Sequence, residues 1–416
     1  MVILSKKKTA LISVLVIITS LAIAIVVVAP LLIPFLQPRF DVSQEHDEPE
    51  NTRIATIDSS SNNQTAVTTT TATTTTTTIM PTSIDIVSTT SAFPFVQRWA
   101  AQYENQQLPS SGNVNVNYLT DREIMVAERA SGSGDLAIVG VPNENNNNTI
   151  YIPVSAQAVA IVYNIPSFPD IPSGLRLNST MLSLILNGSI TRWNDAAIKD
   201  LNPSLNLPDE RIVVVHDDDD DNNNDSSTSS MVLLNQYLGL QSLNWPKNNS
   251  ITVSGPAELA ETVRKTPYSV GYVDFSYAVQ TRMTYAAIED ADGNYIIPSM
   301  QSIGQAVDIA LQFQESTIDP ALSLLSQQSP PTINASRIAN GSYPIVGLYY
   351  ASLLTNDERL EDEGRSSIAA TLDFVEWIIS ESGGQQTLLE VQYPPIYSNN
   401  EELATYATTA MDKMKK

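Results

Sequence analysis

The 416-residue chain is long enough for two folded domains, and 42% of its residues are hydrophobic. Its 22 Lys and Arg against 45 Asp and Glu give a formal net charge of −23, which argues against nucleic acid as a partner because phosphate backbones are bound by clustered Lys and Arg. The chain has no cysteine, which excludes disulfides, Cys-ligated zinc, iron–sulfur clusters, thiol catalysis and an acylated-cysteine anchor.

The N-terminal segment predicts a membrane anchor. Residues 1–8 end in three lysines, and residues 9–36 form an uncharged apolar run long enough to cross a bilayer as a helix. A cleaved signal peptide is the alternative, but its apolar core would be only about 7 to 15 residues long. Because no comparably dense basic cluster follows the run, we expect a single-pass plasma-membrane protein with a cytoplasmic N-terminus and an extracellular bulk.

Residues 37–82 predict a disordered stalk, because they contain few large apolar residues and a long run of threonines that suits O-glycosylation. The chain also contains acceptor triplets for N-glycosylation, which begin at Asn63, Asn147, Asn178, Asn187, Asn224, Asn248, Asn334 and Asn340. Together with the anchor and the lack of cysteine, these features favour a glycosylated cell-surface protein of archaeal type.

From about Ser83 onward, helical stripes and short apolar runs alternate. Residues 93–103 and 367–380 carry apolar side chains at helical spacing, which is typical of helices that pack on a core: Phe95, Val96, Trp99, Ala100 and Tyr103 in the first, and Ile368, Leu372, Val375 and Ile379 in the second. Between them lie short runs such as DLAIVGV and AVAIVYN, which are bounded by Gly, Pro, Asn or Asp as buried strands are. This alternation predicts an α/β architecture with mostly parallel or mixed sheets.

Residues 190–203, ITRWNDAAIKDLNP, resemble a motif of the phosphate-binding proteins of ABC importers. Further stretches of the chain also resemble this family and lie in the same order as in its members, among them TTSAFPFVQRW, SVGYVDFSYA, YPIVGLYY and QYPPIY. The resemblance implies a type II periplasmic-binding-protein fold, in which two crossing strands join two α/β lobes around a ligand cleft. Lobe 1 would comprise residues 84–157 and 281–416, and lobe 2 would comprise residues 158–280.

A desolvated oxyanion needs fixed donors, and in this family four clusters supply them. Thr90 and Ser91 match the first cluster, a hydroxyl pair at the start of a helix, although either residue can equally be a simple N-cap. At the second cluster the stretch NYLTDREIM offers Thr120 as its only hydroxyl residue. Val139 and Gly140 occupy the third, where the family has a carboxylate that distinguishes protonated phosphate from sulfate, and this carboxylate is absent here.

The fourth cluster is a loop that reads R-x-D-G-S-G-T-[ST] in the family. Asp225, Ser227, Thr228 and Ser229 match its Asp, Ser, second Gly and Thr places, and Asn223 stands where the family has arginine. The loss of this arginine removes the one full positive charge that a desolvated anion would meet.

Five aspartates, from Asp217 to Asp221, precede this loop. They suit a calcium loop, a solvated and partly disordered insert, or a remodelled pocket for a cationic or neutral ligand. Because no glycine and no closing glutamate follow at the calcium-loop places, we expect at most a weak Ca²⁺ association at these aspartates and no other cofactor. Like charges in a block repel one another and extend the chain, which favours the insert.

The residues predict no enzyme. The two histidines are His46 in the stalk and His216 at a strand end. The sequence therefore offers no set of residues for a His-based catalytic triad or a histidine metal site. The resemblance implies a membrane-anchored extracellular solute-binding protein that takes inorganic phosphate or a related oxyanion and works with an ABC permease in the same membrane. The alternative is a degenerate binding-protein domain without phosphate binding, with a surface structural, adhesive or sensing role.

Overall fold

The computed structural model describes residues 83–106, 113–119, 135–142, 149–166, 174–218, 229–312, 330–354, 364–398 and 400–415. The predicted cytoplasmic N-terminus, membrane helix and stalk lie outside these residues, and so does most of the Asp run with the loop that follows it. Among the helices that the structure describes, none combines the length and the apolar character needed to cross a bilayer. The anchor at residues 9–36 therefore stays a prediction.

Eight strands form one mixed sheet in the described fold: β1 (Ile84–Thr89), β2 (Val114–Leu119), β3 (Leu136–Val139), β4 (Thr149–Asn164), β6 (Val213–Asp217), β7 (Ser250–Val253), β8 (Ser269–Asp274) and β13 (Val346–Leu354). They lie in the order β2-β1-β3-β13-β4-β8-β6-β7. β1 is parallel to β2 and β3, β6 is parallel to β7 and β8, and β4 is antiparallel to β13 and β8. The predicted α/β architecture with a mixed sheet is confirmed.

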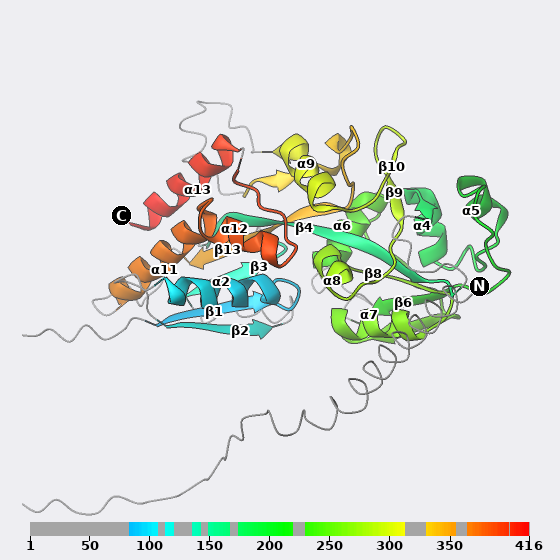
Figure 1. Ribbon diagram of the computed structural model, residues 1–416, viewed down its shortest axis with the longest axis horizontal. Coiled ribbons are helices and arrows are strands. Elements are labelled where there is room, and N and C mark those ends of the chain that lie inside the picture. Colours follow the sequence, from blue (N-terminus) through cyan, green and yellow to red (C-terminus); the bar gives the residue numbers. More distant parts are fainter. Residues whose placement is uncertain are drawn as a thin grey trace, which may run out of the picture. The chain divides into compact units, whose positions relative to one another are not determined.

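Helices accompany both halves of this sheet (Figure 1). With β1, β2 and β3 lie α2 (Phe93–Asn105), α11 (Gly364–Ile379), α12 (Gly384–Glu390) and α13 (Glu401–Met414). With β6 and β8 lie α4 (Ser179–Leu186), α5 (Ala196–Leu201), α6 (Ser229–Leu238), α7 (Pro256–Lys265) and α8 (Phe275–Gln280). The remaining elements are β5 (Arg176–Leu177), β9 (Ala287–Glu289), β10 (Tyr295–Ile296), α9 (Met300–Ala310), β11 (Leu311–Gln312), β12 (Thr332–Ile333) and η3 (Ala335–Arg337).

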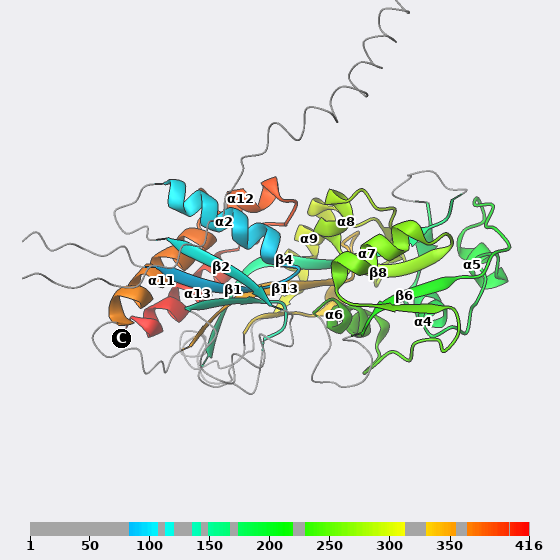
Figure 2. The ribbon, with the colours of Figure 1, turned by 90° about the horizontal axis from the view of Figure 1, so that it is seen from below.

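Strand β4 connects the two halves of the sheet. Its 16 residues pair with β13 from Thr149 to Ala158 and with β8 from Val159 to Asn164. Nearly all of them are buried, as in strands that are covered on both faces. Figures 1 and 2 both show β4 running from the group around β1 and β3 to the group around β8 and β6.

Both predicted helical stripes pack on the core. In α2 all five stripe residues are buried, and Pro94 fits the first turn, where no intrahelical N–H bond is lost. In α11 Leu372 and Val375 are buried, whereas Ile368 and Ile379 are only half-buried at its two ends. Phe374 and Ile378 are fully buried as well, so the buried face of α11 includes residues that the predicted stripe left out.

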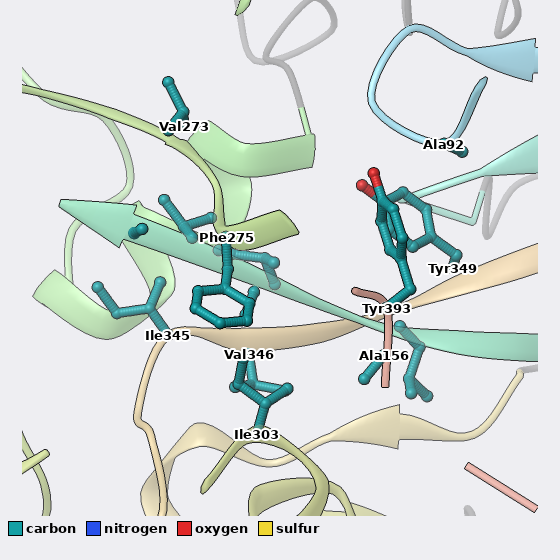
Figure 3. Close-up of a cluster of buried hydrophobic side chains, with 14 of the residues drawn as sticks. Ala92, Ala156, Val273, Phe275, Ile303, Ile345, Val346, Tyr349 and Tyr393 are labelled. Carbon is teal, nitrogen blue, oxygen red and sulfur yellow. The ribbon is translucent and has the colours of Figure 1, made fainter. Parts of the chain in front are cut away.

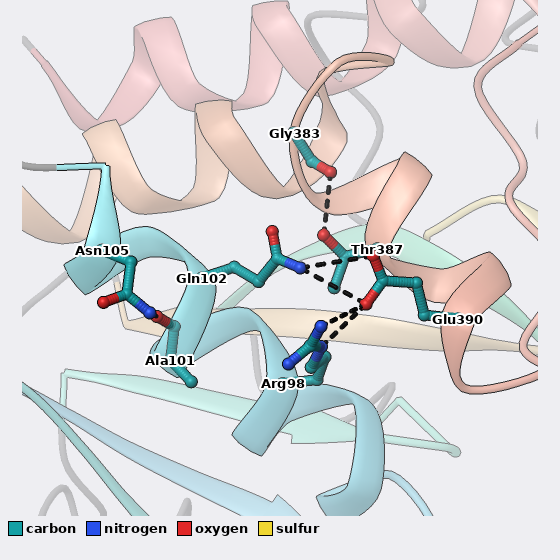
Figure 4. Close-up of polar contacts among 7 residues, drawn as sticks. All are labelled: Arg98, Ala101, Gln102, Asn105, Gly383, Thr387 and Glu390. Atoms are coloured by element: carbon teal, nitrogen blue, oxygen red, sulfur yellow. Dashed lines mark hydrogen bonds and ion pairs between the residues drawn. The ribbon is translucent and has the colours of Figure 1, made fainter.

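Hydrogen bonds and one ion pair connect α2 with α12 (Figure 4). Arg98 Nε donates to Glu390 Oε2 at 2.8 Å, and Gln102 Nε2 donates to the same carboxylate. These side chains are about half exposed, so the ion pair contributes at most about 1 kcal/mol. Trp99 is fully buried and its Nε1 donates to Gly384 O at 2.8 Å, so burial and this inner bond hold the helices together.

Replacing Gly384 by Ala tests how closely the start of α12 packs against the end of α11. A Cβ on Gly384 would lie 2.5 Å from both Cα and the carbonyl oxygen of Ile378, and these backbone atoms cannot turn away. We expect Gly384→Ala to lower the free energy of unfolding by about 1–3 kcal/mol in urea titrations. Gly304→Ala in α9 is the control, because a Cβ there meets no atom within 4 Å and alanine favours the helix by about 0.5–1 kcal/mol. Equal changes in the two variants would contradict the expectation.

Candidate functional site

The predicted ligand residues divide into those that the structure describes and those that it does not. Thr120, Asp225, Ser227 and Thr228 lie outside the described residues. Thr90 and Ser91 precede α2, Gly140 follows β3, and Ser229 begins α6. Three of the four expected clusters are therefore represented, and their role in binding stays a prediction.

Gly140 and Ser229 meet, together with Gln157 from the middle of β4. A Cβ on Gly140 would lie 2.4 Å from Ser229 Cβ and 2.9 Å from Gln157 Oε1, so the close approach requires glycine. Gln157 Nε2 donates to Ser229 Oγ at 2.8 Å, and both residues are buried. The end of β3, the middle of β4 and the start of α6 thus converge at one point.

Thr90 and Ser91 do not cap α2. The N-cap residue is Ala92, and no side chain bonds to the first turn from that position. The hydroxyl that bonds to the backbone at the start of α2 is that of Thr89, whose Oγ1 accepts from Ala92 N at 3.3 Å and lies 3.4 Å from Ser91 Oγ. Because Ala92 is the N-cap and its N–H bonds to the Thr89 hydroxyl, the capping alternative is wrong for Thr90 and Ser91.

Ser91 adjoins a buried polar network that the sequence did not indicate. Tyr393 donates through its hydroxyl to Ser91 O at 2.6 Å, and Tyr349 donates to Asp274 Oδ2 at 3.0 Å. Asp274 also caps α8, since its Oδ1 accepts from Ser276 N at 2.9 Å. Figure 3 shows the hydroxyls of Tyr349 and Tyr393 pointing to the side on which the Ala92 segment lies. The network links the end of β8 with β13 and with the start of α2.

Burial dominates the electrostatics of this network. Desolvation raises the pKa of Asp274 to about 6, although the hydrogen bonds from Tyr349 and from Ser276 lower it. Desolvation also raises the pKa of Tyr349 and Tyr393 well above the ordinary range, and the nearby carboxylate of Asp274 adds to this effect. The two tyrosines therefore remain hydrogen-bond donors, and Asp274 is the group of the network that titrates near neutrality.

The end of β6 is packed into the fold. The His216 ring stacks on Trp245 at a centroid distance of 4.4 Å, and Asp217 Oδ1 accepts from Gly255 N at 3.1 Å just before α7. Within the described residues, no group of three or more His, Asp and Glu side chains is arranged to hold a metal ion. Residues 219–221 lie outside that part of the chain, so weak Ca²⁺ association stays a prediction.

The motif at residues 190–203 serves the fold. Trp193 is fully buried and its Nε1 donates to Tyr268 O at 2.9 Å. Asn202 Oδ1 accepts from Arg176 N at 2.8 Å, and its Nδ2 donates to Arg176 O at 3.0 Å. The strongest sequence signal therefore stabilises the β5–α5 region, and it says little about a ligand.

Sequence reasoning missed Gln157, Asp274, Tyr349 and Tyr393. For Gln157 a signal was present, because it is a polar residue inside the apolar run YIPVSAQAVAIVYN, where a strand covered on both faces normally has none. The other three have no local signal, because Asp274 and Tyr349 lie 75 positions apart and meet only in the folded chain.

Replacing Asp274 by Asn is expected to change how stability depends on pH. The folded chain raises the pKa of this carboxyl from 3.8 to about 6, so its contribution to stability is fully present below about pH 4 and is lost as the pH rises through 6. The total is about 3 kcal/mol. Asparagine keeps an oxygen acceptor for Ser276 N and places an NH2 donor before the Tyr349 hydroxyl, which can turn to accept from it, and it carries no buried charge. Asp274→Asn should therefore be the more stable protein above about pH 6.

Urea unfolding between about pH 4 and 8 measures this difference. Asp373→Asn, an exposed position of α11, is the control and should follow the wild type at each pH. Parallel pH profiles of Asp274→Asn and the wild type would contradict the assignment.

Comparisons with known proteins match most of the chain. A family model described as a PBP superfamily domain matches residues 59–382. The phosphate-binding protein PstS of Methanocaldococcus jannaschii is 25% identical over 324 residues, which cover 72% of this chain and 80% of that protein. PstS of Xylella fastidiosa is 26% identical over 320 residues, which cover 74% and 79%.

Among solved structures, a high affinity periplasmic phosphate-binding protein, PfluDING, bound with phosphate, aligns with a TM-score of 0.55 at 12% sequence identity. The alignment covers 79% of this chain and 93% of that one. At this identity the likeness concerns the fold alone, and it supports the expected two-lobed α/β periplasmic-binding-protein architecture.

Proposed function

The chain belongs to the PBP superfamily, and from this premise we propose that it is a solute-binding protein that holds inorganic phosphate or a related small oxyanion between two lobes. The curated relatives are named phosphate-binding proteins, which are not enzymes. The proposal transfers their ligand class to a site whose residues differ at several places.

The observation that carries the proposal is the meeting of Gly140 with Ser229. Two residues from separate expected ligand clusters, 89 positions apart by number, lie close enough to exclude a Cβ between them. Gly140 lies just past the carboxyl end of β3, and Ser229 begins α6. Strand ends and helix starts are where α/β folds place anions, because free N–H groups and the helix dipole favour negative charge there.

The division into lobes follows from the same proposal. Lobe 1 is residues 84–157 with 281–416, and lobe 2 is residues 158–280. The pairing of β4 supports this boundary, because β4 leaves β13 after Ala158 and joins β8 at Val159. A hinge at this point would open and close the cleft beside Gln157.

The setting that we propose is the cell surface. Residues 9–36 anchor the chain in the plasma membrane, and residues 37–82 form a glycosylated stalk that lets the lobes reach an ABC permease in the same membrane. Support comes from the apolar run, the lysines before it and the threonine-rich composition. Weak Ca²⁺ association at Asp217 to Asp221 belongs to the same set of proposals.

Calorimetric titration of the full-length protein with inorganic phosphate tests the ligand, with and without added Ca²⁺. We expect binding heat and a rise in thermal stability, since a ligand at about 100 times its Kd stabilises the folded state by about 2.7 kcal/mol. Absence of both heat and stabilisation would favour the degenerate domain without phosphate binding.

Replacing Ser229 by Ala tests the site itself. Loss of one hydroxyl beside a charged ligand should weaken phosphate binding about tenfold. Ser250→Ala is a matched control in β7, where the hydroxyl donates to Pro246 O at 2.6 Å, and it should bind phosphate like the wild type. Equal affinities in both variants would place the ligand elsewhere.

A further inference from the structure

We propose that Gln157 selects the ligand: its side-chain oxygen accepts a hydrogen bond from the O–H group of a protonated oxyanion. The inference rests on the proposed function and adds to it the residue that distinguishes phosphate-like anions, which carry a hydrogen, from sulfate-like anions, which carry none.

The first observation is that the side-chain oxygen of Gln157 has no hydrogen-bond donor. Gln157 is 1% exposed, and its Nε2 donates to Ser229 Oγ at 2.8 Å. Its Oε1 is buried and has no hydrogen-bond partner. Leaving a buried amide oxygen unpaired is unfavourable, so a ligand that brings a hydrogen to this atom gains binding energy from filling it.

The second observation is where this oxygen lies. Gln157 Oε1 is 2.9 Å from the place that a Cβ on Gly140 would take. Gly140 and Val139 stand at the strand end where the family resemblance calls for a carboxylate, and neither can supply an acceptor from its side chain. An acceptor that β3 lacks is thus delivered to the same point by a longer side chain from β4.

The third step concerns charge. A carboxylate at this point would repel the anion unless a positive group balanced it, and the arginine place of the fourth cluster holds Asn223. The side-chain oxygen of a glutamine accepts a hydrogen bond, and the side chain carries no charge. The family's acidic acceptor and its arginine are therefore both missing from their aligned places in the sequence, and a neutral acceptor at Gln157 matches that double change.

The chemistry that follows is selective. Hydrogen phosphate presents a P–O–H group that can donate to Gln157 Oε1. Sulfate at neutral pH presents oxygen atoms without hydrogen, so its lone pairs face those of the amide oxygen and the acceptor stays unfilled. Sites built around such a polar group reject a ligand that lacks the matching hydrogen, because the group is then buried without a partner.

The test compares inorganic phosphate and inorganic sulfate by calorimetry near neutral pH on the full-length protein. The wild type should bind phosphate about 10- to 100-fold more tightly than sulfate. Gln157→Met should lose most of that ratio, chiefly through weaker phosphate binding. Gln157→Glu should bind both anions more weakly, because its carboxylate repels them, but should keep the ratio, since a carboxylate accepts the same hydrogen bond.

Gln385→Met is the control for structural damage. Gln385 is also a buried glutamine, but its amide is fully used: Nε2 donates to Val154 O at 2.9 Å, and Oε1 accepts from Ile396 N at 2.9 Å. This variant should lower thermal stability and leave the phosphate-to-sulfate ratio unchanged.

The outcomes separate two failures. A wild type that binds neither anion overturns the proposed function and the role of Gln157 with it. A wild type that binds phosphate, with an unchanged ratio in Gln157→Met, overturns the role of Gln157 alone. If Gln157→Met does not fold, Gln157→Glu decides, because a ratio well below that of the wild type contradicts the proposal.

Discussion

The structure depends on the continuity of β4 as a buried strand that changes its neighbour between Ala158 and Val159. A strand that passes from one half of a sheet to the other leaves backbone carbonyls that the ladder does not pair. Side chains from the last third of the chain donate to them: Tyr343 to Val159 O, Gln385 to Val154 O, Tyr397 to Pro153 O and Tyr406 to Tyr151 O. Because buried carbonyls need partners, these bonds tie the C-terminal segments to the connecting strand.

The same strand brings the candidate site together. Gln157 lies two residues before Val159, where the pairing changes, and it contacts Ser229 at the start of α6. Gly140 closes the contact from β3 because it has no side chain to obstruct it. If the two halves move about β4 as we propose, these groups separate less than groups at the outer edges of the sheet.

The candidate site and the tyrosine network differ in whether they bury an ionisable side chain. The candidate site joins neutral polar groups, Gln157 and Ser229, whereas the network beside Ser91 buries the carboxylate of Asp274 with two tyrosine donors. Burial raises the pKa of Asp274 to about 6, so at neutral pH the fold carries a desolvated negative charge that hydrogen bonds only partly offset. Asp274 therefore places an acidic group in the interior of the fold.

The sequence by itself determined the α/β class, the helical stripe of α2 and the family, because apolar periodicity and a contiguous motif are local properties of the chain. It also named Gly140 and Ser229 as site residues through the resemblance. Only the tertiary structure decided that these two meet, that Gln157 lies beside both with an unpaired oxygen, and that Asp274 reaches Tyr349. Each of these contacts joins residues that are far apart in sequence, and burial and hydrogen bonding act on distances in space that no local pattern encodes.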